Sequence, residues 1–232
     1  MGDMSRDLEI EIAERKRAEE RAKHLNALLR AVRNVSQLIA REKNRGHLLQ
    51  DACECLSEVR GYNSTWVVLL DESGKVTVAA EAGLGKDFQS LIDRAKSGEW
   101  NHCAERALSQ TGACIIEDPA SVCGDCLLAK KCIDRKAIVS RLEYGEEVFG
   151  LMVASIDSDH AIDKEEQSLF EEVAGDISFA LHSIRLEEER RLAEGALLLE
   201  QSRLEALEKM FNNNSDEAED EDDVSAINLE DD

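Results

Sequence analysis

Residues 137–155 read AIVSRLEYGEEVFGLMVAS, and this stretch decides the fold. Residues 137–143 alternate between two sets of side chains, which is the pattern of a strand with one buried face. Residues 148–155 are largely apolar on both faces and are therefore expected to form a central strand. Because Tyr-Gly-Glu-Glu at 144–147 is a turn sequence, the stretch predicts two neighbouring strands joined by a short connection.

The segments around this pair predict a fold of helices and strands. Strands are expected at residues 65–70, 75–80 and 113–117, and helices at 46–59, 88–97 and 102–109. Asp163 is a good N-cap, and Glu166 would complete a capping box at the start of a long helix. The apolar face of that helix would cover the sheet with Leu169, Phe170, Val173, Ile177, Ala180, Leu181 and Ile184.

Both ends of the chain carry long helical patterns. Nothing breaks a helix from Asp7 to about Glu42, and residues recur there at alternating steps of four and three: Ala18, Ala22, Leu25, Leu29, Val32, Ser36 and Ile39. The same rhythm runs from Leu186 to Phe211. Such a repeat forms the seam of a coiled coil, so we expect a homodimer through a parallel coiled coil; a single helix lying on its own domain is the alternative. His24 and His182 are interpreted as surface or seam residues.

The charge and composition exclude several classes of function. The formal net charge is −22, and residues 212–232 hold ten acidic residues and no Lys or Arg. We therefore expect no nucleic acid and no membrane among the partners, and a disordered acidic tail beyond Phe211. The chain has no apolar run of about 18 residues and no signal-peptide pattern, so we expect it to be cytoplasmic. In that reducing compartment, metal binding, redox sensing or burial explains seven cysteines better than disulfides do.

Residues 114–132 read CIIEDPASVCGDCLLAKKC and hold four of the seven cysteines. Cys123 and Cys126 form a C-x2-C pair, which brings two thiolates to one side of a tight loop, where they can share a metal or the edge of an iron–sulfur cluster. Cys132, and then Cys114 or Cys103, would complete the ligand set. A thiol–disulfide switch, a haem-linked cysteine and simple packing are the alternatives.

Two lysines precede the last cysteine of this loop. Lys130 and Lys131 add positive charge next to Cys132, and positive charge lowers the pKa of a thiol. We therefore expect at least one thiol of the loop to be partly ionised near neutral pH. Cys53 and Cys55 fall on different faces of a predicted helix and are left out of the site.

Two segments resemble parts of a GAF domain. Residues 146–153, EEVFGLMV, resemble its penultimate turn and last strand, and residues 163–174, DKEEQSLFEEVA, resemble the start of its long C-terminal helix. The resemblance covers about residues 28–184. Residues 11–20, EIAERKRAEE, are similar to the connector helix that often follows a PAS domain in sensor histidine kinases, and residues 199–207, LEQSRLEAL, resemble a connector into a following module.

The resemblance implies an α+β fold with an antiparallel sheet of five or six strands, N- and C-terminal helices on one face and a ligand pocket on the other. The chain would then divide into an N-terminal coiled-coil connector helix at 1–27, a sensory domain at 28–184, a C-terminal coiled-coil helix at 185–211 and the acidic tail at 212–232. Residues 82–136 would form the roof of the pocket, and they contain five cysteines.

The resemblance also ranks the candidate ligands. Some similar sensor kinases carry a cysteine near Cys103 and a C-x2-C near Cys123 and Cys126, so these three come first as metal ligands, Cys132 next and Cys114 last. The implied cofactor is an iron–sulfur cluster or another cysteine-ligated metal, with haem and zinc as further candidates. A cyclic-nucleotide motif is absent.

The implied function is a sensory module of a two-component signalling system. The cysteine-ligated centre would change its redox or ligation state, and the coiled coil would relay the change to a histidine kinase or another signalling protein. Trp100 and His102, beside the roof, are candidate ligand-pocket residues. The chain has no phosphoacceptor-histidine motif and no Gly-rich ATP lid, so we expect no enzyme activity. A ligand-free dimeric scaffold and a thiol-based reductase of GAF fold are the alternatives.

Overall fold

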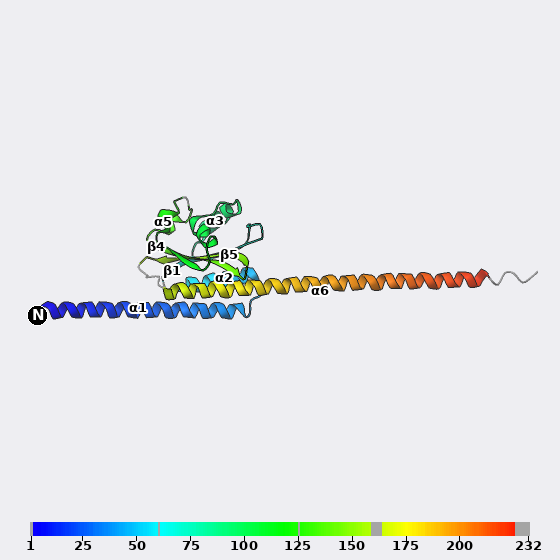
Figure 1. Cartoon of the computed structure of the whole chain (residues 1–232), viewed down its shortest axis with the longest axis horizontal. Coiled ribbons are helices and arrows are strands. Elements are labelled where there is room, and N and C mark those ends of the chain that lie inside the picture. The colour runs from blue at the N-terminus through cyan, green and yellow to red at the C-terminus, as the bar shows by residue number, and fades with distance from the viewer. Residues whose placement is uncertain (1, 60, 125, 159–163, 226–232) are drawn as a thin grey trace, which may run out of the picture. The chain divides into compact units, whose positions relative to one another are not determined.

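A computed structural model describes the backbone of residues 2–59, 61–124, 126–158 and 164–225, and within these ranges the side chains of residues 6–209 except residue 129 (Figure 1). The chain divides into two compact units, Met1–Ile184 and Arg185–Asp232. The first unit contains the sheet, and the second contains the C-terminal part of the last helix.

The first unit is built on one antiparallel sheet of five strands, in the order β2-β1-β5-β4-β3. Its strands are β1 (Tyr62–Leu70), β2 (Val76–Ala82), β3 (Ala113–Ile116), β4 (Arg135–Tyr144) and β5 (Glu147–Asp157). The predicted α+β fold is confirmed, and β5 is the central strand, buried from Phe149 to Ile156. A Cβ at Gly150 would lie 1.9 Å from the carbonyl oxygen of Val68, so the close approach of β5 to β1 requires glycine there.

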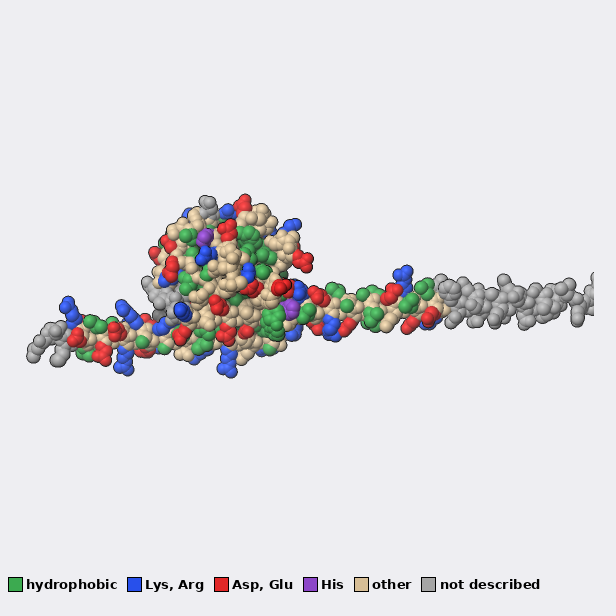
Figure 2. Space-filling view, in the orientation of Figure 1, with side chains coloured by type: hydrophobic (Ala, Val, Ile, Leu, Met, Phe, Trp, Pro, Cys, Tyr) green, Lys and Arg blue, Asp and Glu red, His purple; other side chains and the backbone are tan. Residues whose placement is uncertain are grey.

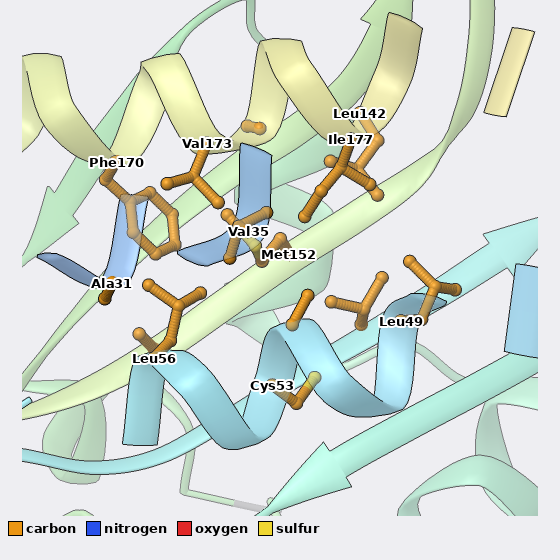
Figure 3. Close-up of a cluster of buried hydrophobic side chains, with 14 of the residues drawn as sticks. Ala31, Val35, Leu49, Cys53, Leu56, Leu142, Met152, Phe170, Val173 and Ile177 are labelled. Carbon is orange, nitrogen blue, oxygen red and sulfur yellow. The ribbon is translucent and has the colours of Figure 1, made fainter. Parts of the chain in front are cut away.

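Three helices cover one side of the sheet, which we call the helix face: α1 (Gly2–Ile39), α2 (Arg45–Ser57) and the first part of α6 (Lys164–Ser225) (Figure 1). Phe170, Val173 and Ile177 of α6 point into this core toward Val35 of α1 and Met152 of β5 (Figure 3). These side chains match the apolar face that the sequence predicts for α6. Their burial holds the first part of α6 on the sheet.

Helix α1 packs on its own domain through a buried stripe that shares only Val32 with the predicted seam. The buried positions are Leu28, Ala31, Val32 and Val35, whereas Leu29 of the predicted seam is 50% exposed. The alternative of a helix lying on its own domain therefore applies to this half of α1. Because the exposed seam positions remain available, the predicted coiled-coil pairing stays a prediction.

A buried polar cluster joins α1 to the first turn of α6. The Nε2 atom of His24 lies 2.9 Å from Oε1 of Glu166, and Nη1 of Arg21 donates to Oε2 at 3.1 Å. The interpretation of His24 as a surface or seam residue is wrong, because its partner is 142 residues away in the sequence and the side chain is buried. Ser36 also donates to Asp176 at 2.8 Å, so the two helices run side by side in the same direction.

Burial and charge act in opposite directions on the carboxylate of Glu166. Burial raises its pKa, but the hydrogen bonds and charges of His24 and Arg21 outweigh burial and hold the pKa below its ordinary value. Glu166 is thus a buried, paired anion, a role that the capping-box prediction did not include. The predicted N-cap, Asp163, lies outside the described residues.

Four short helical segments cover the opposite side of the sheet, which we call the cysteine face: α3 (Lys86–Lys96), α4 (His102–Leu108), α5 (Pro119–Val122) and the 3-10 turn η1 (Ala129–Lys131). A second hydrophobic core lies beneath them. It joins Trp66, Leu151 and Val153 of the sheet to Leu91 of α3 and Cys103 of α4.

The last helix ends later than the sequence predicts. It continues past Phe211 to Ser225, so residues 212–225 are helical, and the prediction of disorder is wrong for them. The physical reason is that residues 196–225 contain no Gly or Pro, and Asn costs less than about 0.7 kcal/mol relative to Ala in a helix. Residues 226–232 lie outside the described part of the chain.

Apolar side chains are exposed along the helix of the second unit. They include Leu186, Leu197, Leu204 and Leu207 of the predicted seam, and Figure 2 shows such side chains between charged ones. None of the described helices is both long and apolar enough to cross a membrane.

Candidate functional site

Four of the five candidate cysteines line one cavity on the cysteine face: Cys103, Cys123, Cys126 and Cys132. Its volume is about 30 Å³. A cavity needs about 10–15 Å³ to hold a water molecule, so this one has room for a single small guest. Trp66 and Val153 of the sheet form part of its wall. We call this space the cysteine cavity.

Short local structures bring these cysteines together. Cys103 lies in the first turn of α4, whose N-cap is Asn101. Cys123 follows α5, which begins with Pro119 at its first turn. The backbone N–H of Cys126 donates to the carbonyl oxygen of Cys123 at 2.7 Å and closes the tight turn of the C-x2-C pair. The sulfur atoms of Cys103 and Cys123, which are 20 residues apart, lie 3.8 Å from each other.

The other two candidate cysteines differ in their positions. Cys132 follows η1 and lines the cavity, half-buried. Cys114 lies on β3 and packs against the same hydrophobic core, but the residues that line the cavity do not include it. Cys53 is fully buried on the helix face, in the other core.

A larger pocket opens beside the cysteine cavity, with a volume of about 260 Å³. Trp100 and His102, the two candidate ligand-pocket residues, both line it. Three residues line both spaces: Asn101, Cys123 and Cys126. We call this larger space the outer pocket, and these three residues separate it from the cysteine cavity.

Three thiols of the cavity have raised pKa values. The hydrogen bond with Cys103 raises the pKa of Cys123, and the hydrogen bond with Cys123, together with burial, raises the pKa of Cys126. Burial and the neighbouring thiols raise the pKa of Cys132 to about 11. These three side chains are therefore neutral thiols at neutral pH.

The predicted effect of the lysines is thus wrong for these thiols. Lys131 turns its ammonium group toward the carbonyl oxygen of Leu84 and toward Asp87, whose carboxylate lies 2.9 Å away. Burial is the largest cause of the raised pKa of Cys132, and Arg135 is the cation that lowers it. These contacts tie the cysteine loop to Leu84 and to the first turn of α3.

The donor set fits a cysteine-ligated metal in its chemistry, and in part in its geometry. Four thiolates are a ligand set of structural zinc and of iron–sulfur clusters. Two thiolates on one tetrahedral zinc at about 2.3 Å lie about 3.8 Å apart, which is the separation of Cys103 and Cys123. Among the described residues, no three His, Cys, Asp or Glu side chains are already grouped so that they could hold a metal ion. Binding would therefore require Cys126 or Cys132 to move.

Sequence reasoning missed Asn101 as part of this site. Its Oδ1 atom accepts from the N–H of Ala104 at 2.9 Å, and its Nδ2 atom donates to the sulfur of Cys126 at 3.6 Å. The available signal was the position of an Asn directly before a predicted helix, which favours an N-cap. Nothing in the sequence indicates the contact with Cys126.

Comparison with known proteins identifies one curated relative and many solved structures of the same fold. The chain is 28% identical over 182 residues to the sensor histidine kinase YhcY of Bacillus subtilis (strain 168), an alignment that covers 72% of this chain and 45% of the kinase. The chain thus spans less than half of the length of that relative.

Two solved structures illustrate the shared fold. The GAF domain of a phosphoenolpyruvate-protein phosphotransferase from Coxiella burnetii has a TM-score of 0.52 and 14% identity, over 71% of this chain and 98% of that one. The free methionine-R-sulfoxide reductase from Neisseria meningitidis has a TM-score of 0.51 and 16% identity, over 69% of this chain and 91% of that one. At these identities the similarity concerns the fold alone.

The family is established by a match to the sequence model of the GAF domain. The match extends over residues 44–183, which is more than half of the chain. It runs from the residue before α2 into α6 and includes the whole sheet and the cysteine face. The chain therefore belongs to the GAF domain family, and a long helix precedes and another follows its sheet in the sequence.

Proposed function

We propose that this GAF domain is the sensory part of a signalling protein and that its cysteine cavity binds a thiolate-ligated metal centre, either zinc or an iron–sulfur cluster. The observation that carries the proposal is the convergence of four cysteines on one cavity, with two sulfur atoms already 3.8 Å apart. The ligands would be Cys103, Cys123, Cys126 and Cys132. Haem is disfavoured, because a cavity of about 30 Å³ is far smaller than the several hundred cubic ångströms that a ligand of that size fills. An iron–sulfur cluster, which is larger than a single ion, would require the segment of Cys126 and Cys132 to move outward.

The residues of the cavity define what binding would require. The bound metal would supply positive charge and, in a cluster, an electron-accepting group. Because the pKa values of Cys123, Cys126 and Cys132 are raised, these thiols must release protons as they become ligands, so affinity rises with pH. Trp66 and Val153 give the cavity an apolar wall on the side of the sheet.

A pair of hydrogen bonds between the edge strand β3 and α6 supports a relay from this site to α6. The N–H of Ala113, at the start of β3, donates to Oε1 of Glu171 at 2.9 Å, and the amide of Gln167 donates to the carbonyl oxygen of Ala113. Ala113 follows α4, which carries Cys103, after a short connection. A shift of α4 on metal binding or oxidation would thus reach α6. This shift transmits a signal if the two states of the metal centre favour different positions of α6.

The partner that receives this signal is proposed from the relative and from the exposed helices. Similarity to a sensor histidine kinase favours a histidine kinase or another signalling protein as the output. A groove of about 320 Å³ between α1 and α6, lined by Leu25, Leu29 and Leu169, favours a second copy of this chain as the helix partner. The exposed leucines of α6 would extend that parallel coiled coil.

The proposal is tested by metal analysis of protein purified without oxygen. We expect zinc, or iron with acid-labile sulfide and visible absorption, bound to the wild-type chain. Cys123→Ser should abolish most of the bound metal, because it removes a central ligand. Cys53→Ser is the matched control, since Cys53 is an equally buried cysteine on the helix face, and it should retain the wild-type metal content. Colourless, metal-free protein with reduced cysteines, even after reconstitution, would refute the metal centre.

A thiol-based reductase is the second candidate, because Cys103 and Cys123 are close enough to approach a disulfide with a small movement. The raised pKa of Cys123 disfavours it, since the thiolate is the nucleophile in such enzymes. In the metal-free outcome above, reduction of free methionine-R-sulfoxide that depends on Cys103 and Cys123 would establish this candidate.

A further inference from the structure

Asn101 connects the two segments that carry the cysteines. Its Oδ1 atom caps α4 by accepting from Ala104, which fixes the first turn of the helix that carries Cys103. Its Nδ2 atom donates to the sulfur of Cys126, 25 residues later in the chain. One side chain therefore sets the distance between the helix and the loop of the C-x2-C pair.

The sulfur of Cys126 accepts from two N–H groups. Besides Asn101 at 3.6 Å, the backbone N–H of Leu128 donates to this sulfur at 3.4 Å. Hydrogen bonds of this kind stabilise a thiolate and tune a metal that it binds. Cys126 is the only cysteine sulfur for which two such donors are recorded among the described residues.

The position of Asn101 suits a role in orientation. It lies between the cysteine cavity and the outer pocket and lines both. It carries no charge, so it supplies a hydrogen bond to the sulfur without adding a competing ligand. Its contact with Cys126 keeps that sulfur on the cavity side of the loop, near Cys123.

We propose that Asn101 is a positioning residue of the cysteine centre, which holds the sulfur of Cys126 toward Cys103 and Cys123 and donates a hydrogen bond to it. For a bound metal, this inference rests on the proposed function. The contact between Asn101 and Cys126 itself does not depend on metal. The metal proposal and the role of Asn101 are therefore tested by different measurements.

The test replaces the amide without removing the cap. Asp caps helices as well as Asn does, so Asn101→Asp keeps the acceptor for Ala104, removes the donor to Cys126 and places a carboxylate beside the sulfur. Asn44→Asp is the matched control, because Asn44 caps α2 by accepting from His47 at 3.1 Å on the helix face. Both variants should melt close to the wild-type temperature.

The first measurement is the affinity for Co²⁺, followed by the thiolate-to-cobalt absorption band and by competition with a chelator. Loss of an outer hydrogen bond typically weakens metal binding by about 10–100-fold, and we expect Asn101→Asp to fall in this range. Asn44→Asp should bind as the wild type does. Wild-type affinity in Asn101→Asp overturns the inference, as does a loss of affinity accompanied by a drop in melting temperature that Asn44→Asp does not show.

The second measurement uses metal-free protein. Cys126 lines the outer pocket, so iodoacetamide reaches it, and peptide mass spectrometry gives its alkylation rate. Removal of the donor should slow alkylation of Cys126 several-fold while leaving that of Cys55 unchanged. Equal rates in wild type and Asn101→Asp overturn the inference. If the wild type binds no Co²⁺ but alkylation slows in the variant, the metal proposal fails and the role of Asn101 in orienting Cys126 stands.

Discussion

The two faces of the sheet use cysteine in opposite ways. On the helix face, Cys53 of α2 is fully buried in a largely aliphatic core and contributes as a small apolar group (Figure 3). On the cysteine face, four cysteines line a cavity, and a pocket of about 260 Å³ opens beside it. The same residue type is thus a packing element on one face and a candidate ligand on the other.

The lengths of the covering helices explain this difference. On the cysteine face, α3, α4, α5 and η1 have 11, 7, 4 and 3 residues, whereas α1 has 38 and α2 has 13. Short helices are marginal on their own, so side-chain contacts determine where they lie. A ligand can shift such elements at low cost, while the long helices move as stiff bodies. Under the proposed function, the cysteine face would sense and the helix face would transmit.

The largest effect should come from removing the same side chain on each face. Phe170 of α6 is fully buried, whereas Phe88 of α3 is 9% exposed and lies at the rim of its core beside Trp66. We expect Phe170→Ala to lower the free energy of unfolding by about 4 kcal/mol and Phe88→Ala by at least about 1 kcal/mol less, because the looser face can collapse around the gap. Urea unfolding measures both. Equal losses of unfolding free energy in the two variants would show that the two faces are packed equally tightly.

A smaller effect is expected at the polar cluster of the helix face. Glu166→Gln removes a buried anion from His24 and Arg21 and should cost about 2–3 kcal/mol at pH 7. Because the pKa of Glu166 is below its ordinary value of 4.5, its stabilisation is present above that pH and is lost as pH falls through the lower value in the folded state. The difference in the free energy of unfolding between Glu166→Gln and the wild type should therefore become smaller below pH 4.5. Glu165→Gln, on the exposed side of the same turn, is the control.

The smallest effect should come from the contact that joins the faces. Glu171→Ala leaves the N–H of Ala113 without its acceptor and should cost about 1 kcal/mol. Hydrogen exchange at Ala113 should accelerate, since the edge strand β3 loses one of its two hydrogen bonds to α6. Glu172→Ala, at the exposed neighbouring position, should leave that exchange rate unchanged. Unchanged exchange in Glu171→Ala would argue against the relay.

Local patterns in the sequence were sufficient for most of the fold. The alternation before the turn at 144–147 and the apolar run after it predicted β4 and β5, and the helix of 102–109 is α4 to within a residue. The pattern of neighbouring residues within each of these elements is enough to specify it. The extension of α6 beyond Phe211 was missed because three consecutive Asn residues resemble a helix end but cost little there.

The site was predictable only in part. The C-x2-C spacing pointed to Cys123 and Cys126, and the family resemblance added Cys103, but the Asn101 contact and the turn of Lys131 toward Asp87 depend on segments far apart in the chain. The buried pair of His24 and Glu166 likewise depends on two segments that are far apart in the chain. A sequence pattern indicates which groups are present, whereas the charges that surround them come from tertiary contacts.

The buried pairing of α1 with α6 has a practical consequence for isolating the sensory domain. A polypeptide cut to residues 44–183, the limits of the family match, would lack the whole of α1. It would expose the apolar surface that Leu28 and Val35 cover, and it would leave the carboxylate of Glu166 without its partners Arg21 and His24. The smallest autonomous folding unit therefore has to begin upstream of Arg21.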